Sequence, residues 1–282
     1  QVLKLWEGLG YYTRARNLHE AAKMIVKQFG GHIPNDPEIL RSLPGIGPYT
    51  AGAVASIAFQ KPVPLVDGNV ARVLSRIFYL RDDISKPKTQ KKLYDLAGPL
   101  VYRNSPGAWN QALMELGSLI CVPEIPKCSI CPVQSFCLAF QKGRAAQLPV
   151  RLPARQIKKI QMAVAILKRN GKLLVRRRPE HGIWGGLWEL PGTVRTKNET
   201  IEEALKNEFK QAFGISISIR KRIPPFRHRF THREALIFPF EVKRIGNGRL
   251  LPMKTNLRWA DGRSLRELSF PRPHQKIIHG IH

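Results

Sequence analysis

The stretch LPGIGPYTAG, residues 43–52, interrupts a helical region of the sequence and restarts it at once. Just upstream, Asp36 is a good N-cap residue and Pro37 suits the first helical position, which predicts a short helix before the stretch. The glycines permit positive φ angles, and Pro48 fits the first turn of a second helix running to about Phe59. The sequence therefore predicts a helix–hairpin–helix.

A turn of this kind offers free backbone N–H groups at a helix N-terminus, and such groups bind an anion without any side chain. Gly45 and Gly47 are the candidate contacts to a DNA phosphate. The alternative is a plain connection between two helices.

A second motif, VPLVDGNVARVLSRI, follows at residues 63–77. Its apolar start predicts a buried approach, and Val70, Val73, Leu74 and Ile77 have helical spacing. Asp67 is therefore expected at the start of a helix close to the hairpin. An aspartate in that place can also be an ordinary N-cap.

Composition and charge suggest the kind of partner. The 282 residues suffice for two domains, and the net charge is +27. Residues 1–150 hold 18 Lys and Arg against 10 acids, and residues 151–282 hold 29 against 10. This surplus favours a polyanion, nucleic acid before an anionic membrane. No apolar run is long enough for a membrane span, and no signal peptide is evident, so we expect an intracellular protein.

All four cysteines fall within CVPEIPKCSICPVQSFC, at Cys121, Cys128, Cys131 and Cys137. Two disulfides are the alternative to a metal, but a large chain without a signal peptide belongs in a reducing compartment. Zinc accepts four thiolates, although usually from paired C-x2-C knuckles, whereas one compact loop is typical of iron–sulfur ligation. We therefore predict a [4Fe-4S] cluster with a structural or DNA-positioning role.

The second half of the chain has a different pattern. Residues 148–159 are rich in proline and basic residues, which predicts a linker. Two alternating strands then flank Asn170-Gly171, a strong hairpin signal. A helix with Asn198 as N-cap and Gly214 at its end follows, and further strands complete an α+β domain.

Together, the hairpin, the VDGNVARVLSR motif and the cysteine spacing resemble the helix–hairpin–helix DNA glycosylases of the endonuclease III superfamily, over residues 1 to about 140. Bifunctional lyases of that superfamily have a Schiff-base Lys just after the hairpin, where this chain has Pro48 and Tyr49. This difference, with LWEGLGYYTRARNLHEAA and VDGNV, resembles the MutY branch of monofunctional adenine glycosylases. The resemblance implies removal of adenine mispaired with 8-oxoguanine in double-stranded DNA, in base excision repair.

The same resemblance implies residue roles. Asp67 would face the sugar cation, Asn69 would help to hold the site, and Tyr49 would supply a hydroxyl group and a ring near the developing charge. Leu9 and Tyr11, in the GLGYY turn, would wedge into the base stack; a glycine-capped helix end with core tyrosines is the alternative.

The C-terminal half resembles the MutT or Nudix hydrolases, but only Glu208 remains of their magnesium-binding cluster and Lys210 would repel a cation. It is therefore expected to be a non-catalytic Nudix-like domain that recognises 8-oxoguanine. Phe230, Thr231 and His232 match the family loop that contacts the lesion strand.

The predicted fold class is multidomain. An all-α glycosylase domain (1–140, with the iron–sulfur loop at 121–137) precedes a linker (141–159) and an α+β Nudix-like domain (160–282). We expect a monomer in the bacterial cytoplasm or nucleoid.

The family's catalytic Glu lies on a helix before LWEGLGYY and has no match here, since Glu7 belongs to the next segment. We expect an N-terminal truncation. The alternatives are a catalytically silent protein that binds lesion DNA and, less favoured, a glycosylase/lyase similar to endonuclease III.

Overall fold

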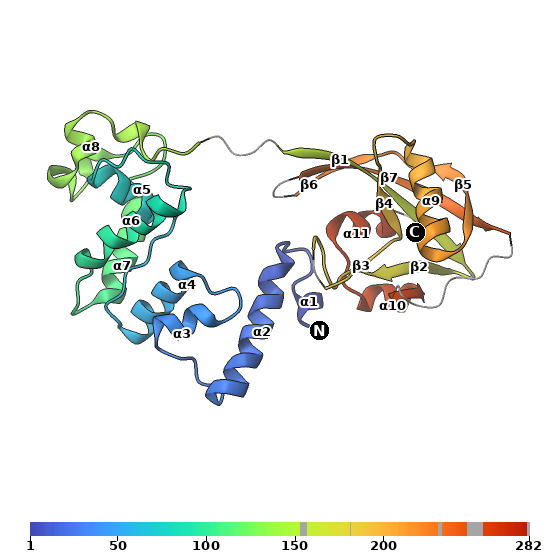
Figure 1. Cartoon of the computed structure of the whole chain (residues 1–282), viewed down its shortest axis with the longest axis horizontal. Helices are drawn as coiled ribbons and strands as arrows, with labels where there is room; N and C mark the ends of the chain where they lie inside the picture. The colour runs from blue at the N-terminus through green and yellow to red at the C-terminus, as the bar shows by residue number, and fades with distance from the viewer. Residues whose placement is uncertain (153–156, 181, 231–232, 247–255, 281–282) are drawn as a thin grey trace. The chain divides into compact units, whose positions relative to one another are not determined.

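The structure is a computed structural model that describes residues 1–152, 157–180, 182–230, 233–246 and 256–280. It divides into two compact units, one formed by Asn17–Ala154 and the other by Gln1–Arg16 with Arg155–His282. Below, these are called the helical unit and the mixed unit (Figure 1). Within the described ranges, no helix has the length and apolar character needed to cross a lipid bilayer.

The helical unit is built from short helices. Helix α2 (Tyr12–Phe29) begins in the mixed unit's N-terminal segment, which also holds α1 (Val2–Leu5). The rest are α3 (Pro37–Ser42), α4 (Pro48–Ala53), η1 (Val54–Ala58), α5 (Gly68–Ile77), α6 (Pro87–Ala97), η2 (Gly98–Leu100), α7 (Pro106–Glu115), η3 (Leu116–Ile120), η4 (Cys128–Ile130), η5 (Gln134–Phe136), α8 (Leu138–Gln141) and η6 (Ala145–Gln147).

The helix–hairpin–helix is confirmed as α3, a turn and α4. Asp36 caps α3, because its carboxylate accepts hydrogen bonds from the backbone N–H groups of Glu38 and Ile39. Helix α4 begins at Pro48 and continues directly as η1, a π-helical turn that ends at Ala58. Leu40, Leu43, Ala51 and Ala55 form a buried cluster that holds the two helices together.

The mixed unit is a sheet with helices on both faces. The sheet comprises β1 (Lys158–Arg169), β2 (Lys172–Arg177), β3 (Trp188–Glu189), β4 (Gly192–Val194), β5 (Ser216–Arg222), β6 (Phe226–Arg229), β7 (Arg233–Ile245) and β8 (Asn256–Ala260). Its main order is β3-β2-β1-β7-β5, with β1 and β7 parallel and β4, β6 and β8 off this path. The helices are α9 (Ile201–Phe213), α10 (Gly262–Glu267) and α11 (Arg272–His279).

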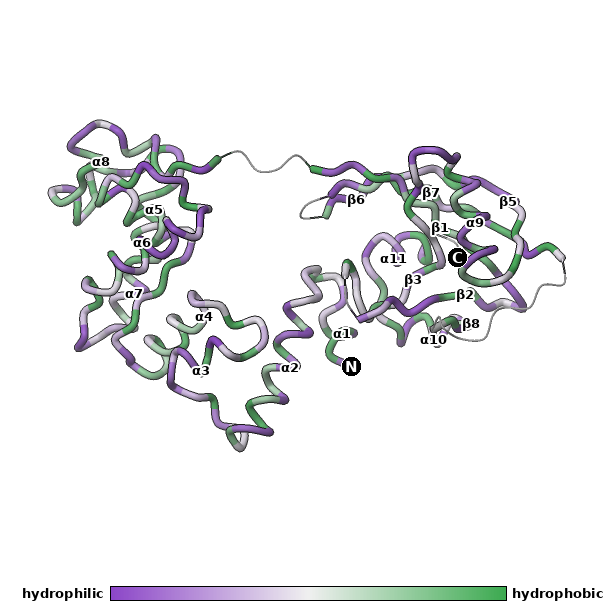
Figure 2. Tube along the Cα trace, in the orientation of Figure 1, coloured by the Kyte–Doolittle hydropathy of each residue, from purple (hydrophilic) through white to green (hydrophobic). Residues whose placement is uncertain are grey.

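Alternate residues of β1 supply two separate cores, because successive strand residues point to opposite faces. Ala163, Ala165 and Leu167 pack with Phe209 and Phe213 of α9. The intervening residues Met162, Val164 and Ile166 pack in the other core, which includes Ile277 and Ile278 of α11. In α9 the buried residues Leu205, Phe209 and Phe213 recur every four residues and so lie on one face of the helix, and the helix carries both hydrophobic and hydrophilic residues (Figure 2).

Two local predictions for this unit have different outcomes. The β1–β2 hairpin is confirmed: Asn170 and Gly171 have φ angles of 48° and 71°, and Arg169 pairs with Lys172. The predicted N-cap Asn198 is wrong, because α9 begins at Ile201 and Thr200 is its cap. Thr200 and Glu203 form a reciprocal capping box, which satisfies two backbone N–H groups instead of one.

Candidate functional site

The hairpin turn has the backbone conformation that its glycines allow. Gly45 has a φ of 79°, and a Cβ atom there would lie 2.6 Å from the Cβ of Asn17. Gly47 is the N-cap of α4, and a side chain on it would point into open space. Within the described ranges, no protein group accepts a hydrogen bond from the N–H of Gly45 or Gly47. Both N–H groups are therefore available to an outside acceptor.

Asp67 lies at the N-terminus of α5 and is half-buried. Its Oδ1 caps the helix by accepting from the Val70 N–H at 2.7 Å, and its Oδ2 accepts from the Asn69 Nδ2 at 3.2 Å. Asp67 is thus an N-cap, which is the alternative role that the sequence allowed. Only one of its two oxygens is used for capping, and the side-chain amide of Asn69 orients the other.

This pair continues into a partly buried chain of polar groups. Asn69 Oδ1 accepts from Arg72 Nη2 at 2.9 Å, and Arg72 Nε donates to the carbonyl of Cys121 at 2.7 Å. Gly117 makes room for the chain, since a Cβ there would lie 2.7 Å from the Cβ of Asn69. The carboxylate at the start of α5 is therefore linked by hydrogen bonds to the first residue of the cysteine loop.

Tyr49 is the second residue of α4 and is 42% exposed. Among the residues with described coordinates, no hydrogen bond joins it to Asp67 or Asn69. One turn further on, Gly52 lets α4 pack directly against the segment leading to Asp67, because a Cβ there would clash with the carbonyl oxygen of Pro64. The helix carrying Tyr49 and the approach to Asp67 are thus in backbone contact.

The four cysteines line one cavity, together with Arg76, Lys127 and Phe140. All four cysteines are free thiols, so the alternative of two disulfides is wrong for this structure. Burial raises the pKa of Cys128, and the three neighbouring cysteine sulfurs raise it further. Across the described ranges, no three His, Cys, Asp or Glu side chains converge closely enough to hold a single metal ion.

In the N-terminal segment, the GLGYY turn exposes both predicted wedge residues. Gly8, Gly10 and Tyr11 all have positive φ angles, and Leu9 and Tyr11 are 68% and 60% exposed. The guanidinium of Arg14 lies 4.6 Å from the centroid of the Tyr11 ring. Tyr12, by contrast, is a core residue.

Glu7 is engaged elsewhere. Its Oε2 pairs with Lys4 at 2.6 Å, and its Oε1 accepts from the Phe270 N–H at 2.8 Å. Burial alone would raise the pKa of Glu7, but these hydrogen bonds outweigh it and lower the pKa. Glu7 is therefore ionised at neutral pH, which does not suit a proton donor.

In the mixed unit, Phe230 is half-buried in an aromatic cluster. Its ring centroid lies 5.0 Å from that of Trp184 and 4.9 Å from that of His228. Thr231 and His232 lie outside the described residues, so their predicted contact with the lesion strand stays a prediction.

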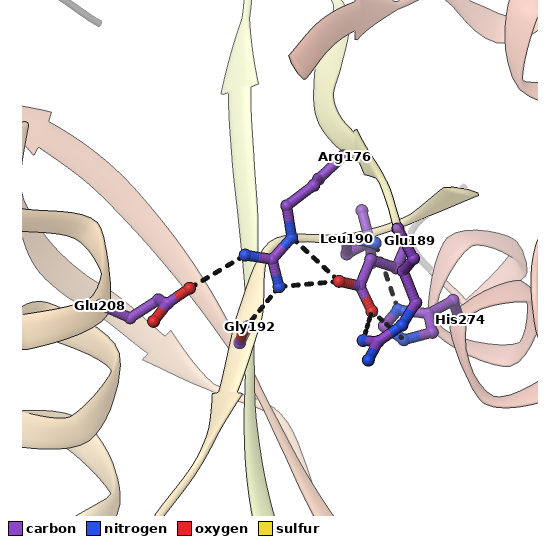
Figure 3. Close-up of polar contacts among 7 residues, drawn as sticks. Arg176, Glu189, Leu190, Gly192, Glu208 and His274 are labelled. Carbon is purple, nitrogen blue, oxygen red and sulfur yellow. Dashed lines mark hydrogen bonds and ion pairs between the residues drawn. The ribbon is translucent and has the colours of Figure 1, made fainter. Parts of the chain in front are cut away.

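The carboxylate that remains of the Nudix metal cluster is held by an arginine. Glu208 Oε1 pairs with Arg176 Nη1 at 2.9 Å, and Arg176 also pairs with Glu189 at 2.7 Å (Figure 3). Glu189 is 2% exposed and pairs on its other oxygen with Arg178. Burial lowers the pKa of the adjacent His274 to about 4, and its Nδ1 accepts from the Leu190 N–H. The histidine is therefore neutral, and the carboxylates are neutralised by arginines.

Both halves of the chain match known families. Residues 1–99 match the HhH-GPD superfamily base excision DNA repair protein, and residues 162–280 match the NUDIX domain. The chain is 32% identical over 283 residues to the adenine DNA glycosylase of Buchnera aphidicola subsp. Schizaphis graminum, covering 98% of this chain and 78% of that relative. It is 34% identical to the adenine DNA glycosylases of Schizosaccharomyces pombe over 260 residues and Mus musculus over 278 residues.

The chain belongs to the adenine DNA glycosylase family. The matches to the Schizosaccharomyces pombe and Mus musculus relatives include 77% and 82% of this chain but only 56% and 54% of the relatives. The chain therefore spans about half the length of these two relatives. The predicted fold class, a helix–hairpin–helix domain followed by a Nudix-like domain, is confirmed by the family matches and by the two units of the structure.

Sequence reasoning found some residues of this adenine glycosylase family member's site and missed others. Asp67 and Asn69 were predicted, and the structure joins them directly. Arg72, Gly52 and Gly117 were missed. Arg72 follows Asn69 by three residues on the same helix, a spacing that could have indicated the contact. The two glycines gave no signal, since their neighbours come from distant parts of the sequence.

Proposed function

We propose that this member of the adenine DNA glycosylase family hydrolyses the N-glycosidic bond of adenine in double-stranded DNA. The observation that carries the proposal is the placement of Asp67, which is half-buried at the start of α5 with one oxygen fixed by the helix and the other oriented by Asn69. A carboxylate held in this way can stabilise positive charge on a sugar without first reorganising.

The reaction needs water as its second reactant. As the bond from the sugar to adenine breaks, the base leaves with a proton and water supplies the hydroxyl group that ends on the sugar. Asp67 faces the positive charge on the sugar, and Tyr49 adds a hydroxyl group and a ring near it. Tyr49 occupies the place of the lyase Lys and cannot form an imine, which favours hydrolysis alone. The family resemblance assigns proton donation to a Glu on a preceding helix, and Glu7 is not given that role.

DNA is the proposed partner. The surplus of 27 positive charges favours a polyanion, and the free N–H groups of Gly45 and Gly47 can bind one phosphate. The exposed side chains of Leu9 and Tyr11 can enter the base stack where adenine is turned out, at a cost that is lower in a mispair. Recognition of 8-oxoguanine is proposed for Phe230, Thr231 and His232. We propose that the protein acts as a monomer inside the cell.

A [4Fe-4S] cluster is the proposed cofactor. The fit rests on the four cysteines, which line one cavity. Their spacing within one compact loop is typical of iron–sulfur ligation. With four thiolates as ligands, a cluster would keep no open position for substrate and would serve to hold the loop and orient it toward DNA. Lys127, which is exposed at the cavity rim, could contact a phosphate.

The decisive experiment measures adenine release by protein expressed from the complete reading frame. The substrates are duplexes with adenine opposite either 8-oxoguanine or guanine. Asp67→Asn keeps an equally good N-cap and should abolish release while leaving affinity for the duplex nearly unchanged. Asp36→Asn is the matched control, because Asp36 caps α3 in the same way and faces no proposed substrate.

The possible results separate the candidate functions. Release that is faster opposite 8-oxoguanine and lost only in Asp67→Asn supports the proposal. Continued release by Asp67→Asn would rule out its assigned role. Tight lesion binding without release by the unmodified protein would favour the silent binder, and a borohydride-stable covalent adduct with DNA would favour the lyase.

A further inference from the structure

We propose that Arg76 is the internal counter-charge of the metal centre at the cysteine cavity and that it raises the reduction potential of this centre. The inference rests on the proposed cluster and goes beyond it, since it assigns a function to a residue that is neither a ligand nor part of the glycosidic site.

Arg76 is 1% exposed, although it belongs to a residue type that is rarely buried without a partner. Its Nε donates to the carbonyl of Leu148 at 2.9 Å, and its Nη1 donates to the carbonyl of Val122 at 2.7 Å. The same Nη1 lies 3.2 Å from the sulfur of Cys121. Arg76 thus joins α5 to the start of the cysteine loop and to Leu148, which lies beyond the end of that loop, and it touches one of the proposed ligands.

The acceptors around Arg76 satisfy its hydrogen bonds but not its charge. They are backbone carbonyls and one cysteine sulfur. Every acidic residue of the chain is within the described ranges, and none of them forms an ion pair with Arg76. A buried cation without a counter-charge is costly. The four cysteine sulfurs, which line the same cavity as Arg76, would supply negative charge as the thiolate ligands of the proposed cluster.

This placement has a consequence for the redox balance of the centre. A gain of one electron makes the centre more negative, and a buried positive charge next to a ligand sulfur stabilises that form. No proton or ligand moves with the electron, which an electrode can supply or accept. Arg76 should therefore shift the equilibrium toward the reduced form.

Lys127 provides an internal comparison. It lines the same cavity but is exposed, so water screens its charge. Arg76→Gln and Lys127→Gln remove the same unit of charge from two sides of one cavity. The inference requires the buried position to have the larger effect.

The test uses the full chain purified with its metal. Iron and sulfide content is measured first, and the reduction potential is then measured by protein-film voltammetry. Arg76→Gln should favour the oxidised form at least tenfold, which for one electron is a fall of about 59 mV. Lys127→Gln should shift the potential by less than half as much. Both variants should bind iron as the parent protein does.

The outcomes distinguish this inference from the cofactor proposal. A parent protein without iron would overturn the cluster itself. Bound iron with equal shifts in the two variants, or with no shift in Arg76→Gln, would overturn the role of Arg76 and leave the cluster standing.

A second measurement does not depend on the folding of Arg76→Gln. Guanidinium nitrogens are labelled with 15N in the parent protein, and pulsed electron paramagnetic resonance is recorded on the paramagnetic form of the centre. A coupling to 15N that disappears in Arg76→Lys supports the contact with the sulfur of Cys121. Absence of any such coupling in the parent would contradict it.

Discussion

Arg76 in the helical unit and Arg176 in the mixed unit both hold a guanidinium group largely away from water, but their partners differ in charge. Arg176 pairs with the carboxylates of Glu189 and Glu208 at 2.7 and 2.9 Å. Arg76 has backbone carbonyls and one cysteine sulfur around it. The charge of Arg176 is balanced by these carboxylates, whereas that of Arg76 is not balanced by any acidic side chain.

This difference in partners explains why a buried arginine has a different role in each unit. Burial alone would lower the pKa of Arg176, but the adjacent carboxylates raise it, so this guanidinium group stays charged. Glu208, which matches a metal ligand of the Nudix hydrolases, is used to neutralise an arginine. In the helical unit, the unbalanced charge of Arg76 instead supports the proposed anionic cluster, whose ligands in the sequence are the four cysteines.

The largest effect on stability is expected when one carboxylate is removed from the ion-pair cluster around Arg176. Glu189→Gln removes the carboxylate shared by Arg176 and Arg178, which leaves Arg178 without a counter-charge and Arg176 with Glu208 alone. Breaking a buried ion pair in this way should lower the free energy of unfolding by about 3–5 kcal/mol. Urea unfolding, followed by a probe in the mixed unit, measures the loss.

Glu208→Gln is the matched control. Its side chain is 24% exposed against 3% for Glu189, and Arg176 would keep its other partner. The loss there should be about 1 kcal/mol. Equal losses in the two variants would mean that the cluster is not organised around Glu189.

The pH dependence of stability gives the next largest effect. Burial lowers the pKa of His274 from 6.5 to about 4, so the unfolded chain binds a proton between these pH values and the folded chain does not. The contribution of His274 to stability is therefore fully present above pH 6.5 and is lost as the pH drops toward 4, by about 3 kcal/mol in all. Chemical unfolding measured in steps over this range tests the slope.

His274→Asn should remove that slope, since the amide oxygen can still accept from the Leu190 N–H but does not titrate in this range. His279→Asn, on the same helix but exposed, is the control and should leave the slope unchanged. If the slope persists in His274→Asn, another titrating group causes it.

Much of this fold could be predicted because its signals are local. Asp36 with Pro37 marks the start of α3, and Asn170-Gly171 marks the β1–β2 hairpin. Helix α9 shows the limit of such signals, because Asn198 and Thr200 are both acceptable caps and only the partner Glu203 decides between them.

The site was less predictable because its parts meet through distant contacts. Asp67 and Asn69 stand two residues apart, and their motif was sufficient to indicate them. Position 52 requires glycine because a side chain there would clash with the carbonyl of Pro64, twelve residues later. The charge of Arg76 is unbalanced because its neighbours, such as the carbonyl of Leu148, come from distant parts of the chain and are not acidic. Neither contact leaves a periodic or compositional trace in the sequence.

The smallest predicted effect tests whether the polar chain of the helical unit acts as a connection between the cysteine loop and Asp67. Asn69→Ala removes the donor to Asp67 Oδ2 and the acceptor for Arg72, while the cap on Val70 remains. The carboxylate should then sample more orientations, and adenine release should slow by at least about tenfold with little change in duplex affinity. Single-turnover release and equilibrium binding measure the two quantities separately. Asn104→Ala, at an exposed position in the same unit, is the control and should match the unmodified protein. Equal losses of binding and release in Asn69→Ala would mean that Asn69 supports the fold of α5 and does not orient Asp67, and the helical unit would then hold its arginines and its carboxylate independently.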